Sequence, residues 1–147
     1  MEKLNVKKLR ENAVIPTRAT GGSAGYDIYA CIDEPVVLKA RSRAVFPTGI
    51  AIAIDDANVA AFVFARSGLG INRGIAPSNC VGVIDSDYRG ECMVGLTNHS
   101  DEDYTVQPGE RIAQMIFMPV YTPELVWIDE LPDTARGEGG FGSTGKQ

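Results

Sequence analysis

The side chains best suited to chemistry lie in residues 79 to 91, which read N-C-V-G-V-I-D-S-D-Y-R-G-E. Two carboxylates, Asp85 and Asp87, follow the apolar run at 81 to 84, and Tyr88 comes next. The apolar run favours a β-strand and the residues after it favour a turn, which predicts a β-hairpin with an acidic tip. A carboxylate there could act as a general base, and the exposed backbone N–H and C=O groups could bind the edge of a flat polar heterocycle. The alternative is that both carboxylates only stabilise the turn and that Tyr88 packs across the strands.

Four further stretches also combine polar side chains with glycine. They are A-G-Y-D at 24 to 27, A-R-S-G-L-G at 65 to 70, P-G-E-R-I-A-Q-M-I at 108 to 116 and R-G-E-G-G-F-G-S-T-G at 136 to 145. The R-S-G sequence suits a phosphate, because Arg66 offers a guanidinium fork, Ser67 a hydroxyl and Gly68 a closely approachable backbone N–H. We expect these three residues to bind phosphate beside the start of a short helix.

The elements that must position these residues are predicted to be β-strands. Apolar residues alternate with others at 49 to 54, 59 to 64, 92 to 96 and 112 to 117, and hardly anywhere follow a helical spacing. Sixteen glycines and eight prolines separate these runs, as tight turns between many short strands require. We therefore expect an all-β, distorted jelly-roll-like barrel or sandwich. Its one short helix would begin near Ser67, whose hydroxyl could cap it.

The length of 147 residues and the 44% hydrophobic content fit one domain with a single core. We expect a β domain over residues 1 to 132 and a flexible glycine-rich C-terminal arm over residues 133 to 147. The first ten residues carry charges throughout and contain no apolar segment, which argues against a secretory signal or a membrane span. A cytoplasmic location is therefore expected.

Composition also argues against several classes of function. The three cysteines are odd in number, far apart and without a C-x-x-C pair, so neither a disulfide framework nor a zinc site is indicated. His99 is the only histidine, which leaves no multi-histidine metal site. The net charge of −5 argues against a nucleic-acid-binding surface. An anionic ligand would have to be attracted by a few local cations and a bound metal.

Taken together, and in their order along the chain, the five stretches resemble the signature motifs of the trimeric dUTP pyrophosphatases (dUTPases). The resemblance runs from Ala24 to Gly145. Ala65 and Gly70 depart from the commoner P-R-S-G-L-A of the second motif, without removing a ligand group. The resemblance implies a homotrimeric enzyme of jelly-roll-like fold that uses Mg²⁺ and water to convert dUTP to dUMP and pyrophosphate. Such an activity keeps uracil out of DNA and supplies dUMP for thymidylate synthesis.

The resemblance also implies a role for each candidate residue. Asp85 would orient and deprotonate the attacking water, Tyr88 would lie against the deoxyribose and exclude a 2′-hydroxyl, and Asp27 would hold Mg²⁺ through water. Uracil would be bound by the Asn79 amide, by the backbone of Val83, Ile84 and Met93, and by Phe141 stacked over the ring. The phosphates would contact Arg66, Ser67, Gly68, Gln114, Arg136, Gly142, Ser143 and Thr144.

Two alternatives to a dUTPase stay open. The dCTP deaminases share the fold but need a different acid–base arrangement around the cytosine amino group, and the R-G-x-G-G-F-G tail favours a dUTPase. A non-catalytic nucleotide-sensing or protein-binding module would have no need of Asp85, Asp27 and the tail together. The expected partners are dUTP and further copies of the chain, with one subunit supplying the hairpin of a site and another the tail. Neither nucleic acid nor a membrane is expected as a partner.

Overall fold

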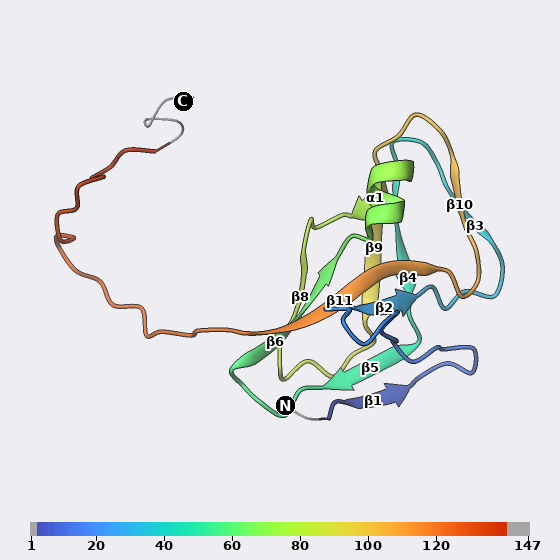
Figure 1. Cartoon of the computed structure of the whole chain (residues 1–147), viewed down its shortest axis with the longest axis horizontal. Coiled ribbons are helices and arrows are strands. Elements are labelled where there is room, and N and C mark those ends of the chain that lie inside the picture. Colours follow the sequence, from blue (N-terminus) through green and yellow to red (C-terminus); the bar gives the residue numbers. More distant parts are fainter. Residues whose placement is uncertain (1–2, 141–147) are drawn as a thin grey trace.

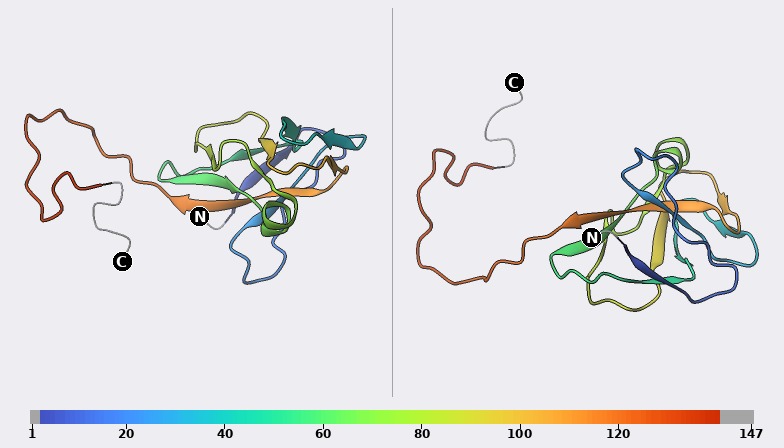
Figure 2. Two further views of the ribbon diagram at one scale, coloured as in Figure 1. Left: turned by 90° about the horizontal axis from the view of Figure 1, so that it is seen from above. Right: turned by 60° about the horizontal axis from the view of Figure 1, so that its bottom comes forward.

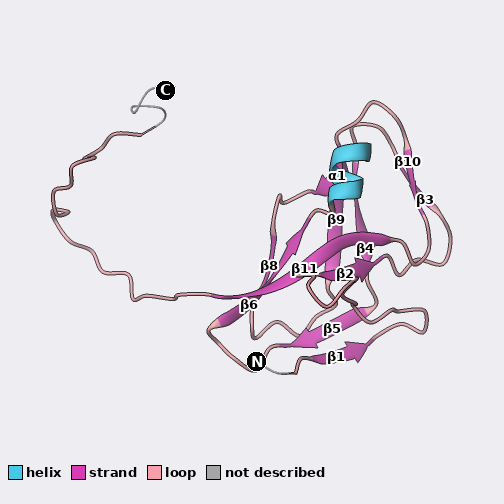
Figure 3. Cartoon of the chain, in the orientation of Figure 1, coloured by secondary structure: helices cyan, strands magenta, loops and turns pink. Residues whose placement is uncertain are grey.

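The computed structural model describes residues 3 to 140, which form eleven strands and one short helix (Figure 1). The first strands are β1 (Asn5–Lys8), β2 (Tyr26–Tyr29), β3 (Val36–Leu38), β4 (Arg43–Pro47), β5 (Ile50–Ala53) and β6 (Val59–Phe64). Helix α1 (Ser67–Arg73) is followed by β7 (Ile75–Pro77), β8 (Gly82–Ile84), β9 (Met93–Asn98), β10 (Tyr104–Val106) and β11 (Arg111–Pro119). Strands dominate the body of the molecule, as Figure 3 shows, and the all-β prediction is confirmed.

The strands form four small sheets around one core. Their strand orders are β1-β5, β10-β3, β2-β11-β6-β8 and β4-β9-β7, and every pairing is antiparallel. The sheets surround one interior in the views of Figure 2, which gives the predicted jelly-roll-like shape. The interior is filled by large apolar side chains that are almost fully buried: Ile28, Leu38, Phe46, Ile75, Leu96, Ile112 and Met115. Buried and more exposed residues alternate along all of β9 and along β6 from Ala61 onward, which is the pattern that predicted strands.

The predicted hairpin over residues 79 to 91 is wrong. Strand β8 pairs with β6 through Val63↔Gly82, Phe62↔Val83 and Ala61↔Ile84, whereas β9 pairs with β4 and β7. The loop at 85 to 92 therefore crosses between two sheets rather than closing a ladder. A strand–turn–strand pattern is local, and it does not say whether the two strands choose each other or more distant partners.

Helix α1 begins at Ser67 as predicted, but the predicted cap by its hydroxyl is wrong. The residue at the N-cap is Arg66, in extended conformation, and no side chain caps the helix. At the other end Gly74 adopts the left-handed conformation with φ of 67°, which is the usual way for a glycine to end a helix. The Ser67 hydroxyl is thus left available to other ligands.

A tight corner between β4 and β5 fixes the far end of the loop at 85 to 92. The Thr48 hydroxyl donates to the backbone oxygen of Cys92, and the Cys92 N–H donates to the Ile50 oxygen over 2.8 Å. Between them Gly49 has φ of +72°, and a Cβ there would lie 2.6 Å from the Ala13 Cβ and 2.7 Å from the Cys31 sulfur. The corner therefore requires glycine for both its backbone conformation and its packing.

After Pro119 the chain leaves the body and runs outward as an extended segment (Figure 1). The predicted boundary at residue 132 lies inside this segment. It exposes large apolar side chains to solvent: Tyr121, Leu125, Val126, Trp127, Ile128 and Leu131, with Trp127 100% exposed. Over residues 3 to 140, no helix has the length and apolar character needed to cross a membrane.

Replacing Gly49 by alanine should lower the free energy of unfolding by about 2 to 5 kcal/mol, because a left-handed backbone cost adds to an overpacking cost. Gly109→Ala is the matched control, since Gly109 has φ of +71° but a Cβ there would meet no atom within 4 Å. The control should lose only about 1 to 2 kcal/mol. Urea unfolding at one protein concentration measures both, and equal losses would show that the corner is not closely packed.

Candidate active site

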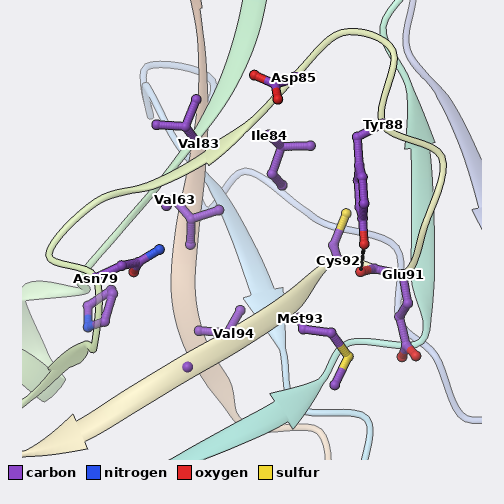
Figure 4. Close-up of a pocket in the computed structure, with 13 residues that line it drawn as sticks. Val63, Asn79, Val83, Ile84, Asp85, Tyr88, Glu91, Cys92, Met93 and Val94 are labelled. Carbon is purple, nitrogen blue, oxygen red and sulfur yellow. Dashed lines mark hydrogen bonds between the residues drawn. The ribbon is translucent and has the colours of Figure 1, made fainter.

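A cavity of about 240 Å³ lies between β8 and β9 (Figure 4). It brings together six residues that the sequence singled out: Asn79, Val83, Ile84, Asp85, Tyr88 and Met93. In Figure 4 Asn79 and Tyr88 stand on opposite sides of the cavity, with Asp85 at one end. Val63, Cys92 and Val94 are among the other residues of its lining. Apolar side chains thus share the lining with exposed backbone and with four polar side chains, those of Asn79, Asp85, Tyr88 and Glu91. Polar groups at fixed positions can orient a small molecule.

Unpaired strand edges give this cavity its binding groups. Within the described residues, β8 has β6 as its only partner, so its second edge has none. The pairing of β9 with β7 ends at Pro77↔Leu96, and beyond it Ser78 N–H donates to the Gly95 oxygen over 2.9 Å. In the part of the chain that the structure describes, Met93 and Val94 are consequently paired only with β4, on their other side. Two strand edges with free backbone donors and acceptors thus face one another across the cavity, and a flat ligand with a polar rim can satisfy them.

Tyr88 stands at the wall of the cavity rather than in the core. Its side chain is 45% exposed, and its hydroxyl donates to the Glu91 backbone oxygen over 3.1 Å. The ring lies so close to Gly90 that a Cβ there would be 2.6 Å from the Tyr88 Cζ. Gly90 therefore lets the ring lie against its own loop, with the other face directed to the cavity.

Asp85 follows the last residue of β8 and is exposed. Its backbone oxygen accepts the Tyr88 N–H over 3.2 Å, which starts the turn. Within the described residues the Asp85 carboxylate makes no ion pair or side-chain hydrogen bond. It is therefore free to bind and orient a water molecule at the mouth of the cavity.

Cys92 also lines this cavity, but it is a poor nucleophile. Burial raises the pKa of the Cys92 thiol to about 11, with a further contribution from the nearby Glu91 carboxylate. The thiol is protonated at neutral pH, whereas the thiolate is the reactive form. The arrangement is therefore unsuited to covalent catalysis by this cysteine.

A second cavity, of about 290 Å³, gathers another five predicted residues: Asp27, Arg66, Ser67, Gly68 and Gln114. Asp27 is 9% exposed and accepts from two guanidinium groups, with its Oδ1 2.8 Å from Arg66 Nε and its Oδ2 3.1 Å from Arg111 Nη1. Arg66 is oriented by this pair and by a 3.2 Å bond from its Nη1 to the Arg111 oxygen. A Cβ at Gly68 would meet no atom within 4 Å, so the backbone there is open to a ligand.

Gln114 fastens the strands that form the second cavity. Its Nε2 donates to the Ala65 oxygen over 2.9 Å, just before Arg66. Its Oε1 would lie 2.6 Å from a Cβ at Gly25, so the glycine of A-G-Y-D leaves room for the amide. The stretches A-G-Y-D, A-R-S-G-L-G and P-G-E-R-I-A-Q-M-I therefore meet at the Gln114 side chain.

The two cavities share no lining residue. Asp27 lies in β2 and Ile84 in β8, which are the opposite edges of the sheet β2-β11-β6-β8. Three interstrand spacings separate these edges, or about 14 Å. One chain therefore contains both groups of predicted residues without bringing them together.

The predicted residues of the tail are described only in part. Arg136 lies in the extended segment, is exposed, and donates from Nε to the Gly139 oxygen over 2.7 Å. Phe141, Gly142, Ser143 and Thr144 lie outside the described residues.

Sequence reasoning missed Glu91, which lines the first cavity, and its partner Arg10. The Arg10 guanidinium, helped by the Gly49 N–H and opposed by burial, lowers the pKa of the Glu91 carboxyl. Nothing in the sequence connects these residues, which are 81 positions apart. Gly90, which precedes Glu91, indicates a turn but gives no sign of the ion pair.

Comparison with known proteins gives a consistent result. The family model described as dUTPase matches residues 11 to 145. The deoxyuridine 5′-triphosphate nucleotidohydrolases of Shigella flexneri serotype 5b (strain 8401) and Sodalis glossinidius (strain morsitans) are each 47% identical to this chain over 151 residues, covering 100% of both sequences.

Solved structures agree with the sequence relatives. The dUTPase of Staphylococcus bacteriophage 80alpha with dUpNHpp is similar at a TM-score of 0.88 and 31% identity, covering 99% of both chains. A dUTPase variant from phage phi11 of S. aureus, whose structure describes the coordination of a structural Mg(II) ion, is similar at a TM-score of 0.78 and 27% identity, covering 88% of this chain and 98% of the other. The chain belongs to the dUTPase family.

Proposed function

We propose that this protein is a dUTP diphosphatase, which hydrolyses dUTP to dUMP and pyrophosphate. The observation that carries the proposal is the cavity between the edges of β8 and β9, with the Asp85 carboxylate at its mouth. Neither these edges nor this carboxylate has a partner among the residues that the structure describes. The full-length similarity to deoxyuridine 5′-triphosphate nucleotidohydrolases supports it.

The backbone edges and the Asn79 amide would bind uracil. Uracil presents two carbonyl acceptors and one N–H donor, and the amide both donates and accepts hydrogen bonds. Cytosine reverses the donor and acceptor pattern at position 4, so it would leave groups in the cavity unpaired. We therefore expect strong preference for dUTP over dCTP.

The Tyr88 ring would lie against the deoxyribose. Its position at the wall of the cavity, held by the bond to the Glu91 oxygen, leaves an open face for the sugar. A 2′-hydroxyl would need the space that the ring fills, so UTP would be excluded by collision.

Asp85 would act on the attacking water. The carboxylate would orient the water and accept its proton as the oxygen attacks the α-phosphorus, and the bond to the leaving pyrophosphate would break. Arg66, Ser67, Gly68 and Gln114 would stabilise the charge on the phosphate oxygens, together with the tail residues Arg136, Gly142, Ser143 and Thr144. Phe141 would cover the uracil. No covalent intermediate with the enzyme is required.

The residues of the second cavity fit Mg²⁺ only as an ion that the nucleotide itself helps to hold. Both Asp27 oxygens already accept from arginine, and the described residues contain no group of three His, Cys, Asp or Glu side chains able to bind a metal. Asp27 would therefore contact the hydrated ion through water, as Mg²⁺ sites commonly allow. When bound, the ion would neutralise phosphate charge.

We further propose that the active enzyme is a homotrimer with sites shared between subunits. The separation of the two cavities supports sharing. A second copy could bring its second cavity, with Arg66, next to the cavity between β8 and β9, which we call the uracil cavity. The apolar side chains of the segment at 120 to 140 support association, since a lone chain leaves Trp127 fully exposed. The tail would then reach the site of a neighbouring subunit.

The alternatives are less well supported. The family model and the named relatives favour dUTP hydrolysis over deamination of dCTP. A purely sensing or protein-binding role would leave the free Asp85 carboxylate and the ordered Arg66–Asp27 pair without a purpose. The cytoplasmic location expected from the N-terminal sequence stays a prediction.

Changing Asp85 to asparagine should keep nucleotide binding but lower kcat for dUTP by about 10²- to 10⁴-fold, the range for loss of a general base. Asp87→Asn is the matched control, because it removes the same charge from the same exposed loop and should leave kcat nearly unchanged. Pyrophosphate release from dUTP and ammonia release from dCTP are followed in parallel. Near-normal turnover by Asp85→Asn would remove Asp85 from the mechanism, and ammonia from dCTP would support the deaminase.

Co-refolding two inactive variants tests the shared site. One is Asp85→Asn, and the other is a chain truncated before Arg136. If one subunit supplies the uracil cavity and the next supplies the tail, every mixed trimer should contain about one working site of three, so activity should return.

A chain that carries both changes is the control for this experiment. Mixed with either single variant, it should restore no activity, because no site then has both an intact Asp85 and an intact tail. Mixed trimers of the two single variants that stay inactive would place the cavity and the tail of each site in one subunit.

A further inference from the structure

The Glu91 carboxylate is held by two segments that are distant in sequence. Arg10 binds it in a bidentate fork, with Nε 3.0 Å from Oε1 and Nη2 3.2 Å from Oε2. The Gly49 N–H also donates to Oε1, over 2.8 Å. The Glu91 side chain is 21% exposed and the Arg10 side chain 48%, so the carboxylate is partly shielded from water while the guanidinium is open to it. A bidentate pair with an added backbone donor fixes its carboxylate more firmly than a single exposed contact does.

The same residue also fixes Tyr88. The Tyr88 hydroxyl donates to the Glu91 backbone oxygen over 3.1 Å, and this is its only hydrogen bond within the described residues. Figure 4 shows the ring reaching down to the Glu91 backbone, while the Glu91 carboxylate points away from Asp85 and Asn79. The Glu91 carboxylate therefore attaches the loop to Arg10 and Gly49, and the Glu91 carbonyl holds the Tyr88 ring at the wall of the cavity.

We propose that Arg10 and Glu91 form a positioning pair that sets the Tyr88 ring and thereby the discrimination between deoxyribonucleotides and ribonucleotides. The proposal rests on the proposed function, in which Tyr88 forms the wall against the sugar. Neither Arg10 nor the Glu91 carboxylate need touch the nucleotide, because both act through the ring.

The loop at 85 to 92 needs such an anchor because no β-ladder among residues 3 to 140 holds it. The Thr48 and Ile50 bonds fix Cys92, which is four residues beyond Tyr88. Between them lies Gly90, whose missing side chain leaves the backbone free to move. The Ile50 bond already holds the peptide plane that carries the Glu91 carbonyl, so the Arg10 fork acts on the Glu91 side chain and, through its Cα, on the loop before it. Without the fork, residues 88 to 90 would be less firmly placed, and the ring would have more freedom to yield to a 2′-hydroxyl.

The test compares Arg10→Met with Lys8→Met. Both remove one positive charge from the same N-terminal segment, but Lys8 makes no ion pair within the described residues. For Arg10→Met, the ratio of kcat/KM for dUTP to kcat/KM for UTP should fall by about tenfold, the scale of one hydrogen bond to a charged group. The kcat for dUTP should fall by less than this ratio, because Asp85 directly follows β8, which is held by its pairing with β6. Lys8→Met should keep the wild-type ratio, and a Glu91→Gln variant provides a second test if Arg10→Met does not fold.

The same substitution in a Tyr88→Ala background distinguishes positioning from general destabilisation. If the pair acts through the ring, Arg10→Met should change the dUTP-to-UTP ratio no further once the ring is absent. An equal change in both backgrounds would overturn the proposal. So would a lower melting temperature of Arg10→Met with an unchanged ratio, since that result would make the pair structural only.

Hydrogen exchange of the nucleotide-free protein gives a readout that does not depend on catalysis. The amides of Tyr88 and Cys92 should exchange faster in Arg10→Met than in Lys8→Met, and equal exchange would overturn the proposal. If the wild-type protein did not hydrolyse dUTP, the proposed function would fail, while the exchange rates would still decide whether the pair fixes the loop.

Discussion

Among residues 3 to 140, no strand lies between the facing edges of β8 and β9, and the rest of the site depends on this gap. Their free backbone groups give the cavity donors and acceptors at fixed positions without side chains. Open edges are also a liability, and here they are short, since β8 has only three residues. Because the two strands do not pair, the loop between them must be held by other means. The corner at Thr48 to Ile50 and the Arg10–Glu91 pair hold it.

The sheet that carries β8 at one edge also positions the phosphate-binding candidates, but near its opposite edge. Asp27 and Arg66 form an ion pair near the opposite edge, so the chain presents two incomplete halves of a nucleotide site. The segment after Pro119 is a third candidate part of the site. It runs away from the body of the molecule, and its own apolar side chains are exposed. Association of several copies would bury these side chains and join the halves. In this account, oligomerisation and catalysis depend on the same topology.

The sequence predicted those parts of the fold and site that depend on local pattern. Alternating apolar runs predicted the all-β fold, and the motif residues Asn79, Asp85 and Tyr88 line one cavity. The hairpin was predicted wrongly because β8 and β9 choose partners distant in sequence, a choice that local pattern does not encode. The Arg10–Glu91 pair was missed for the same reason, since only folding brings the two residues together.

The most direct test of the account is to titrate the protein with dUMP and with dCMP while following its backbone amide resonances. If the open edges bind the base, dUMP should shift the amides of residues 82 to 84 and 93 to 95, and dCMP should shift them much less at the same concentration. The Gly109 amide, which is bonded to the Ala30 oxygen and lies away from the cavity, serves as an internal reference. Equal responses to the two nucleotides, or a dUMP response that bypasses both strand edges, would contradict the account.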